Sequence, residues 1–329
     1  MVSPNTPAAY QRAITDVIAS TPVGRVPFSV EFMPPRNDAA EARLWEAALT
    51  FHDLGVAFVS VTYGAGGSSR QRTLNIAEQL SKMPLTSLVH LTLVNHTEAE
   101  LVEILESYAS CGLSNLLALR GDPPGVDPLG PWQRTPGGFE HASELISLCR
   151  SLPRCQRFQV GIATFPEGHF RAPTLEADTH FTLEKLRAGA DFSITQMFFD
   201  VSYYLRLRDR LLAADPVEGA KPIIPGIMPI TSLRSLHKQI ELSGATVPQD
   251  LLQSLERTQD RASSPEHAQN EVRKIGIEFS TRMAEQLIAE GVPDLHFMTM
   301  NYVRATQEVL HNLGMAPAWG TEHGHDAVR

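Results

Sequence analysis

The sequence has little of what marks a secreted, disulfide-rich or membrane-spanning protein. Its 329 residues include only three cysteines, Cys111, Cys149 and Cys155, and no pair has C-x-x-C spacing. We therefore expect free thiols and no metal site. No apolar run approaches the ~18 residues that a membrane-spanning helix needs. Residues 1–24 lack the basic start and apolar stretch of a secretory signal, so we expect a cytoplasmic protein with no membrane partner.

Positive charge is also scarce. The formal net charge is −9, which makes nucleic acid an unfavourable partner because its phosphates would be repelled. The chain contains neither the G-x-G-x-x-G fingerprint of a Rossmann unit nor a P-loop, so we expect no dedicated nucleotide-binding domain of either kind. Hydrophobic residues make up 43% of the chain, which is enough for a large buried core.

Short apolar runs rich in β-branched residues recur along the chain, each bounded by polar or turn residues. Such runs are typical of buried parallel strands. Stretches whose apolar residues recur at three- and four-residue steps separate them and predict helices, for example 39–52, 98–110 and 175–188. The eight predicted strands are 28–32, 57–62, 87–93, 115–119, 159–164, 192–196, 222–227 and 294–299.

Eight strands that alternate with helices predict an α/β protein, a closed (β/α)₈ TIM barrel. Residues 231–290 are more than one crossover needs, so we expect extra helices between strands 7 and 8. We predict a single catalytic domain over residues 1–318, followed by a polar, disordered tail at 319–329.

Polar residues collect at the predicted carboxyl ends of the strands, the rim where barrel enzymes build their active sites. Glu31 ends the first strand, His90 lies in the third, and Gln196 ends the sixth. Arg120-Gly121-Asp122 follows the fourth. On this interpretation the carboxylates of Glu31 and Asp122 meet across the mouth of the barrel.

Five motifs, in order, resemble those of the methylenetetrahydrofolate reductase family. The resemblance runs from about residue 28 to about residue 313 and implies a flavin-containing barrel that reduces a folate in one-carbon metabolism. The motifs are Ser29-Val30-Glu31-Phe32, Val59-Ser60-Val61-Thr62-Tyr63-Gly64-Ala65, Leu119-Arg120-Gly121-Asp122, Ile194-Thr195-Gln196 with Phe198-Phe199-Asp200, and Ile224-Pro225-Gly226-Ile227.

The resemblance implies catalytic roles for two carboxylates. Glu31 matches the general acid that opens the folate ring, for which a pKa raised by apolar neighbours would be suitable. Asp122 matches the aspartate beside the flavin and the pterin, where its charge would stabilise a cationic folate. Gln196, Leu233 and Tyr302 fall at positions that contact the substrate in the family.

The resemblance also implies FAD as cofactor, with NADH or NADPH as the electron donor and a folate as the small-molecule substrate. Arg120, His169 and Lys185 are donors suited to a diphosphate, and Asp178 could accept from ribose hydroxyls. The positions that match flavin contacts are Thr62, Tyr63, Ala65, His90, Arg120, Gly121, Asp122, Ala142, Phe165, His169, Ala172, Asp178 and Lys185.

Some positions depart from the family pattern. Phe165 and His141 stand where tyrosines are usual, Leu233 stands for a phenylalanine, and Tyr302 for an arginine. Because the departures touch both the flavin and the folate sides, direct hydride transfer from NADH to folate without flavin is an alternative. A non-catalytic paralogue that binds folate or flavin is another, although it would be expected to lose Glu31 first. A Schiff-base aldolase is disfavoured, since no predicted strand ends in lysine.

Overall fold

The computed structural model describes residues 11–63, 67–123 and 130–319, with side chains in the second range described from residue 73 onward. Its centre is a sheet of parallel strands in the order β7-β6-β5-β4-β3-β2-β1-β9-β8. The strands are β1 (Phe28–Phe32), β2 (Val59–Val61), β3 (Ser87–Thr92), β4 (Asn115–Leu119), β5 (Gln159–Thr164), β6 (Phe192–Thr195), β7 (Ile223–Ile224), β8 (Gly226–Ile227) and β9 (Leu295–Met298).

The two outermost members of this order, β7 and β8, are halves of one strand separated by Pro225. β7 pairs with β6 through Ile224 and Ile194, and β8 pairs with β9 through Ile227 and Phe297. The ring therefore closes, and the predicted (β/α)₈ barrel is confirmed. The predicted strand 222–227 is interrupted because proline has no N–H to donate to the ladder, whereas the Pro225 carbonyl still accepts from the His296 N–H at 3.0 Å.

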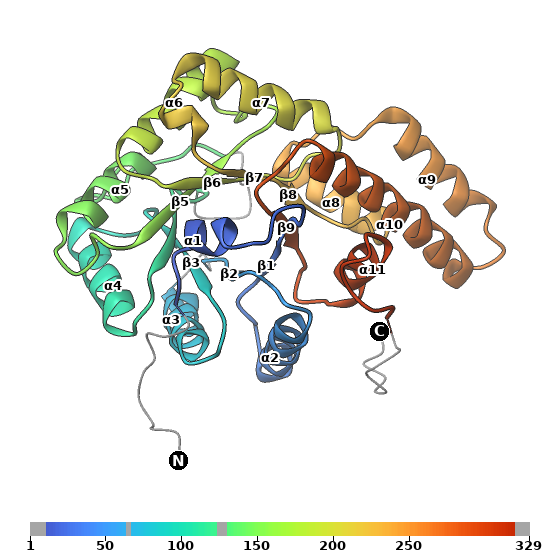
Figure 1. The fold of residues 1–329 in the computed structure, drawn as a ribbon, viewed down its shortest axis with the longest axis horizontal. Coiled ribbons are helices and arrows are strands. Elements are labelled where there is room, and N and C mark those ends of the chain that lie inside the picture. Colours follow the sequence, from blue (N-terminus) through green and yellow to red (C-terminus); the bar gives the residue numbers. More distant parts are fainter. Residues whose placement is uncertain (1–10, 64–66, 124–129, 320–329) are drawn as a thin grey trace.

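Helices surround this ring of strands (Figure 1). Several begin at residues that satisfy free backbone N–H groups: Thr97 and Glu100 form a capping box before α4, and Ser264 caps α10 ahead of Pro265. The outer helices are α2 (Asp38–Asp53), α3 (Gly67–Ser81), α4 (Glu98–Ser110), α5 (Ala142–Ser151), α6 (Leu175–Arg187), α7 (Val201–Ala214), α10 (Pro265–Ala289) and α11 (Arg304–Asn312).

The expected additional helices between the last two barrel strands are confirmed. They are α8 (Leu233–Ser243), α9 (Gln249–Arg261) and the long α10, and a short 3-10 turn at Glu218–Ala220 precedes the seventh strand. A separate apolar cluster joins them to the barrel, with Met228 and Ile230 on the barrel side and Leu236, Leu255 and Val272 on the helices. They extend one side of the barrel (Figure 1).

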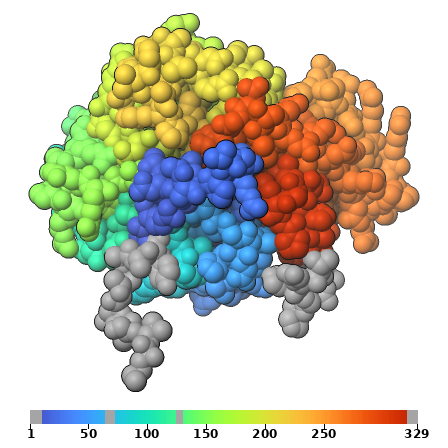
Figure 2. Space-filling view, in the orientation of Figure 1, coloured from blue at the N-terminus to red at the C-terminus, as the bar shows by residue number. Residues whose placement is uncertain are grey.

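A short helix at the start of the described chain, α1 (Ile14–Ala19), was not predicted. Its Ile14 is fully buried with Phe58, Leu88, Phe192 and Ile224, residues of the barrel lumen. The blue segment that contains α1 covers the middle of this face of the molecule (Figure 2). It therefore covers the amino end of the barrel, opposite the carboxyl ends of the strands where the predicted site residues lie.

Other expectations can be compared with the described residues. Cys149 and Cys155 are buried and Cys111 is half-buried, and all three are free thiols. Within the described ranges, no helix is both long enough and apolar enough to cross a bilayer. Ten of the eleven residues in the predicted tail lie outside the described ranges.

The amide of Asn115 ties α1 to the barrel and allows a test of that helix as a plug. Its Oδ1 accepts from the Ile14 N–H at 3.1 Å, and its Nδ2 donates to the carbonyls of Arg12 and Ser87 at 2.9 and 3.1 Å. We expect Asn115→Ala to lower the free energy of unfolding by about 1–3 kcal/mol, because buried groups lose their partners. Urea titration would measure the loss. Asn312→Ala removes one 3.2 Å bond at an exposed position and should cost less. Equal losses would contradict the role of Asn115.

Candidate active site at the barrel mouth

Glu31 lies in the lumen near the mouth, on the opposite face of β1 from Val30 and Phe32. Two imidazoles approach its carboxylate: His90 Nε2 of β3 lies 3.8 Å from Oε2, and His296 Nε2 of β9 lies 3.9 Å from it. The Glu31 side chain is 21% exposed, whereas those of His90 and His296 are 5% and 0% exposed. The carboxylate thus reaches solvent only through the mouth and rests on two buried rings.

The raised pKa that would suit a general acid is not found at Glu31 in the free protein. Burial raises this pKa, but the imidazoles of His296 and His90 outweigh burial, and the pKa lies below its ordinary value. Phe32 points the other way and packs against Phe51 outside the barrel. Burial lowers the pKa of His90 to about 4, so its ring is neutral at neutral pH while Glu31 is ionised.

The end of β9 fixes the backbone around Glu31. Thr299 Oγ1 donates to the Glu31 carbonyl at 2.7 Å. The Asn301 amide accepts from the Met33 N–H at 2.7 Å and donates to the Met33 carbonyl at 2.9 Å. Asn301 has a φ of 64°, a left-handed conformation that asparagine tolerates better than most residues. These bonds hold the segment that follows Glu31 against the last strand.

Asp122 has a different environment, formed by arginines. Burial of its carboxyl raises its pKa above the ordinary value, and Arg120 and Arg171 oppose the rise without reversing it. The residue as a whole remains exposed. Gly121 has a φ of 85°, and a Cβ there would lie 2.5 Å from Val94 Cγ1. Glycine is therefore required at Gly121, and the two carboxylates expected to meet have separate partners, imidazoles for Glu31 and guanidinium groups for Asp122.

Cations gather beside Asp122. Burial and the charges of Arg120, Lys185 and Arg171 lower the pKa of His169 to about 4. Burial lowers the pKa of Lys185 to about 8; Asp178 opposes this shift and Arg120 adds to it. These shifts show that Arg120, Arg171 and Lys185 lie close enough to act on the same neighbouring groups. Their positive charges are therefore concentrated in one region, as a site for a phosphorylated ligand requires.

Asp178 stands beside these cations with one oxygen unused. Its Oδ1 accepts from the His169 N–H at 3.1 Å, whereas its Oδ2 is buried with no hydrogen-bond partner among the described residues. Burial raises the pKa of Asp178, against the effects of the His169 N–H, Lys185 and Arg210. Buried carboxylate oxygens are rarely left unpaired. The free oxygen therefore fits a hydroxyl donor supplied by a ligand.

The remaining predicted residues are spread around the mouth. Tyr63 Oη lies 2.8 Å from His96 Nε2, and the rings of Phe165 and His169 pack edge to face at 4.5 Å. Gln196 turns its Oε1 onto the Met197 N–H at 2.9 Å. Of the predicted substrate contacts, Leu233 is buried and Tyr302 is 58% exposed. Among the predicted cofactor contacts, Thr62 is half-buried, Ala142 is the first residue of α5, and Ala172 donates its N–H to the His169 carbonyl. Ala65 lies outside the described residues.

Three residues near this site were not among the predicted set. His296 lies in the middle of β9, and a search restricted to strand ends passes over it. Trp132 lies under the Arg120 guanidinium at 5.1 Å, and Arg171 donates to the Gly130 carbonyl at 2.6 Å. Arg171 lies two residues after His169, one of the predicted cofactor contacts. Its positive charge was the available signal, because it adds to those of Arg120 and Lys185.

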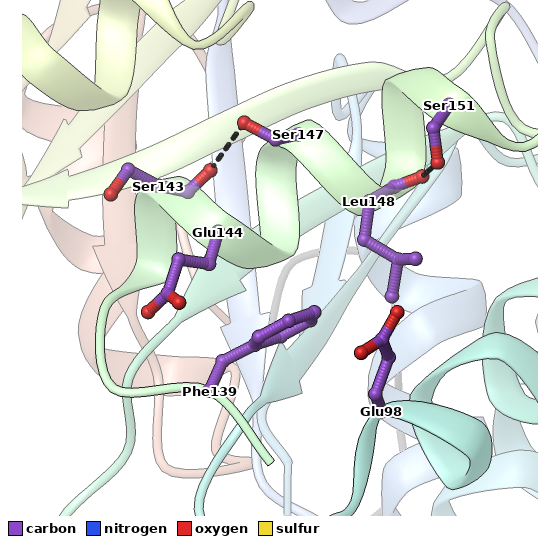
Figure 3. A pocket seen from close by; sticks show the side chains of 7 residues that line it. All are labelled: Glu98, Phe139, Ser143, Glu144, Ser147, Leu148 and Ser151. Carbon is purple, nitrogen blue, oxygen red and sulfur yellow. Dashed lines mark hydrogen bonds between the residues drawn. The ribbon is translucent and has the colours of Figure 1, made fainter. Parts of the chain in front are cut away.

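Two surface hollows lie away from the mouth. One lies between α4 and α5, where Glu98 and Phe139 face the helix that carries Ser143 and Ser147 (Figure 3). Its Ser147 hydroxyl donates to the Ser143 carbonyl at 3.0 Å, so that serine is already satisfied. The other is a shallow hollow on α9 beside Arg257 and Arg261. Neither combines buried charge with unpaired polar atoms as the mouth does.

Known proteins match this chain over most of its length. A family profile described as methylenetetrahydrofolate reductase matches residues 16–314. The 5,10-methylenetetrahydrofolate reductase of Escherichia coli K12 is 34% identical over 297 residues, 89% of this chain and 93% of that protein. An Arabidopsis thaliana protein named methylenetetrahydrofolate reductase (NADH) 1 is 31% identical over 314 residues, 92% of this chain and 51% of that protein.

Among solved structures, a Clostridium thermocellum protein described as binding two copies of 5-methyl-5,6,7,8-tetrahydrofolic acid has a similar fold. Its TM-score is 0.58 at 11% identity, and the match covers 90% of this chain and 96% of that one. At this identity the likeness concerns the barrel alone.

Proposed function

Because the chain belongs to the methylenetetrahydrofolate reductase family, we propose that it reduces 5,10-methylenetetrahydrofolate to 5-methyltetrahydrofolate with NADH or NADPH through bound FAD. The observation that carries the proposal is the pairing of two environments at one barrel mouth. Glu31 lies between two buried imidazoles on one side, and Arg120, Arg171 and Lys185 concentrate positive charge on the other. The first suits an acid, and the second suits a phosphorylated cofactor.

Glu31 is proposed to act as the general acid. Opening the five-membered ring of the substrate requires a proton on one folate nitrogen and leaves a cationic iminium that accepts hydride. In the free protein Glu31 is ionised, because the imidazoles hold its pKa below the ordinary value. A bound pterin would cover the 21% of the side chain that is exposed. Loss of water disfavours the charged carboxylate, so ligand binding should raise the pKa of Glu31.

The cationic side of the mouth fits FAD. Arg120, Arg171 and Lys185 would hold the diphosphate, and Asp178 Oδ2 would accept from a ribose hydroxyl. Bound FAD would supply the two-electron chemistry, by accepting a hydride from the donor and passing one to the folate. The negative charge of Asp122 would stabilise the cationic folate. The Arabidopsis relative is named for NADH, which supports a nicotinamide donor for this chain.

The proposed acid can be tested with Glu31→Gln, which keeps the size of the side chain but holds no transferable proton. We expect folate reduction to fall by at least about 100-fold, the lower range for loss of general acid catalysis. Oxidation of NADH by an artificial acceptor should continue, because it needs no protonated folate. Glu184→Gln, on the outer face of α6, is the matched control. Near wild-type folate reduction by Glu31→Gln would exclude this role.

Asp122→Asn tests the charge beside the cationic folate. A carboxylate ~4 Å from a cation contributes about 4 kcal/mol at an effective dielectric of 20, before desolvation is subtracted. Loss of ~2–3 kcal/mol in the transition state would slow folate reduction by roughly 30- to 150-fold. The donor half-reaction, measured by rapid mixing with NADH, should slow far less because no iminium forms in it. Equal slowing of both half-reactions would show that Asp122 acts on the cofactor or on folding.

The cofactor can be tested through Lys185, whose pKa is about 8. A diphosphate prefers the ammonium form, so FAD affinity should be constant below pH 7 and fall as pH rises through 8. Fluorescence titration of the apoprotein would measure this. Lys185→Arg stays charged and should lose the pH dependence, whereas Lys185→Met should bind weakly at every pH. If the purified protein lacks flavin absorption bands yet reduces the folate by sequential kinetics, the FAD mechanism is wrong and hydride passes directly from NADH to the folate.

A further inference from the structure

A second carboxyl group lies deep in the barrel and has no part in the chemistry described above. Asp294 is fully buried, directly before β9. Its Oδ1 makes a short hydrogen bond with Ser29 Oγ, and its Oδ2 has no hydrogen-bond partner among the described residues. Burial raises the pKa of Asp294 well above its ordinary value, and the bond to Ser29 offsets this only in part. The raised pKa favours the neutral carboxylic acid form of Asp294.

A line of polar atoms leads from Asp294 toward Glu31. Ser29 Oγ lies 2.8 Å from His296 Nδ1. The other ring nitrogen, His296 Nε2, lies 3.9 Å from Glu31 Oε2 and 3.4 Å from Ser60 Oγ. The His296 ring stacks on Phe58 at 5.6 Å with an interplanar angle of 15°, which limits its rotation. Ser29, Ser60 and His296 are all fully buried.

An ionised Asp294 accepts from the Ser29 hydroxyl, whereas a protonated Asp294 would reverse this bond. Its acid proton would then donate to Ser29 Oγ, and the Ser29 hydroxyl proton would be free to donate to His296 Nδ1. A neutral ring that accepts at Nδ1 carries its own proton on Nε2. That N–H faces the Glu31 carboxylate. The titratable groups that face this line are Glu31 on β1, His90 on β3 and His296 on β9, and His90 is neutral.

We propose that Asp294, Ser29 and His296 store a proton in the barrel and deliver it to Glu31 when a folate covers the mouth. This inference rests on the proposed role of Glu31 as the acid. None of the three touches the substrate, so they are positioning residues. Glu31 requires such a proton source, because it is ionised in the free protein and loses contact with water once the folate is bound.

Delivery moves three protons by one place each and creates no net charge. The His296 Nε2 proton passes to Glu31, the Ser29 proton passes to His296 Nδ1, and the Asp294 proton passes to Ser29. Glu31 becomes the neutral acid and Asp294 the carboxylate. The gap of 3.9 Å between His296 Nε2 and Glu31 Oε2 must first close to about 2.9 Å, the usual hydrogen-bond distance. After product release, Glu31 takes a proton from water and the reverse shift restores Asp294.

The pH dependence of folate reduction by the holoenzyme tests this store. The stored proton does not equilibrate with the buffer while the mouth is covered. The wild-type rate should therefore level off above the pKa of Glu31. Ser29→Ala breaks the line, and its rate should fall about tenfold for each further pH unit. Asp294→Asn has no acid proton and should behave like Ser29→Ala.

Ser60→Ala is the matched control, because Ser60 is equally buried and contacts His296 but lies outside the line from Asp294. It should keep the wild-type plateau. Profiles of the same shape for Ser29→Ala, Asp294→Asn and Ser60→Ala would overturn the proposal. A wild-type protein that reduces no methylenetetrahydrofolate at any pH would instead refute the proposed function.

A measurement on the unmodified protein is independent of turnover and of the stability of the variants. Nitrogen-15 spectra of the histidine rings report which nitrogen carries the proton, and His296→Gln identifies the His296 signals by their loss. We expect the proton of the His296 ring on Nε2. A ring protonated on Nδ1, or on both nitrogens, would overturn the stored-proton arrangement even if the protein is an active reductase.

Discussion

Closure of the barrel by the strand around Pro225 is the constraint on which the rest of the site depends. This strand pairs with β6 before the proline and with β9 after it, and β9 in turn lies beside β1. The register of that last pair places Ser29 opposite His296 and Glu31 opposite Met298. Residues more than 260 positions apart in the chain therefore share hydrogen bonds in the lumen. Without the pairing of β1 with β9, Glu31 would lack His296 and its backbone would lack Thr299.

The fold and the rim of the site were predictable because they depend on local patterns. Buried parallel strands are short apolar runs, and five of the nine observed strands begin at the predicted residue. Glu31 and Gln196 lie at the ends of predicted runs, and Asp122 lies three residues beyond one. α1 was missed, because a six-residue helix with one buried residue, Ile14, carries no periodic signal. Its position depends on Asn115, more than a hundred residues away.

The surroundings of Glu31 could not be predicted for a different reason. The residues next to it in sequence, Phe32 and Met33, are weak evidence for its surroundings, because alternate residues of a strand face opposite sides. The groups that determine its pKa come from β3 and β9, and their approach depends on the register of the closed barrel. His296 is two residues from the end of its strand, and only the pairing of β1 with β9 shows that it lies beside Ser29. The sign of the pKa shift follows from that pairing.

The two carboxyl groups in the lumen limit each other's charge. A barrel interior with fully buried walls offers little solvation, so two carboxylates along one line of hydrogen bonds are unfavourable together. One proton shared between them avoids this cost. On the proposed arrangement, the mouth solvates Glu31 in the free protein, and burial favours the proton on the deeper Asp294. A ligand that covers the mouth removes the solvation of Glu31 and brings the proton affinities of Glu31 and Asp294 closer together. Ligand binding itself would then move the proton toward the substrate.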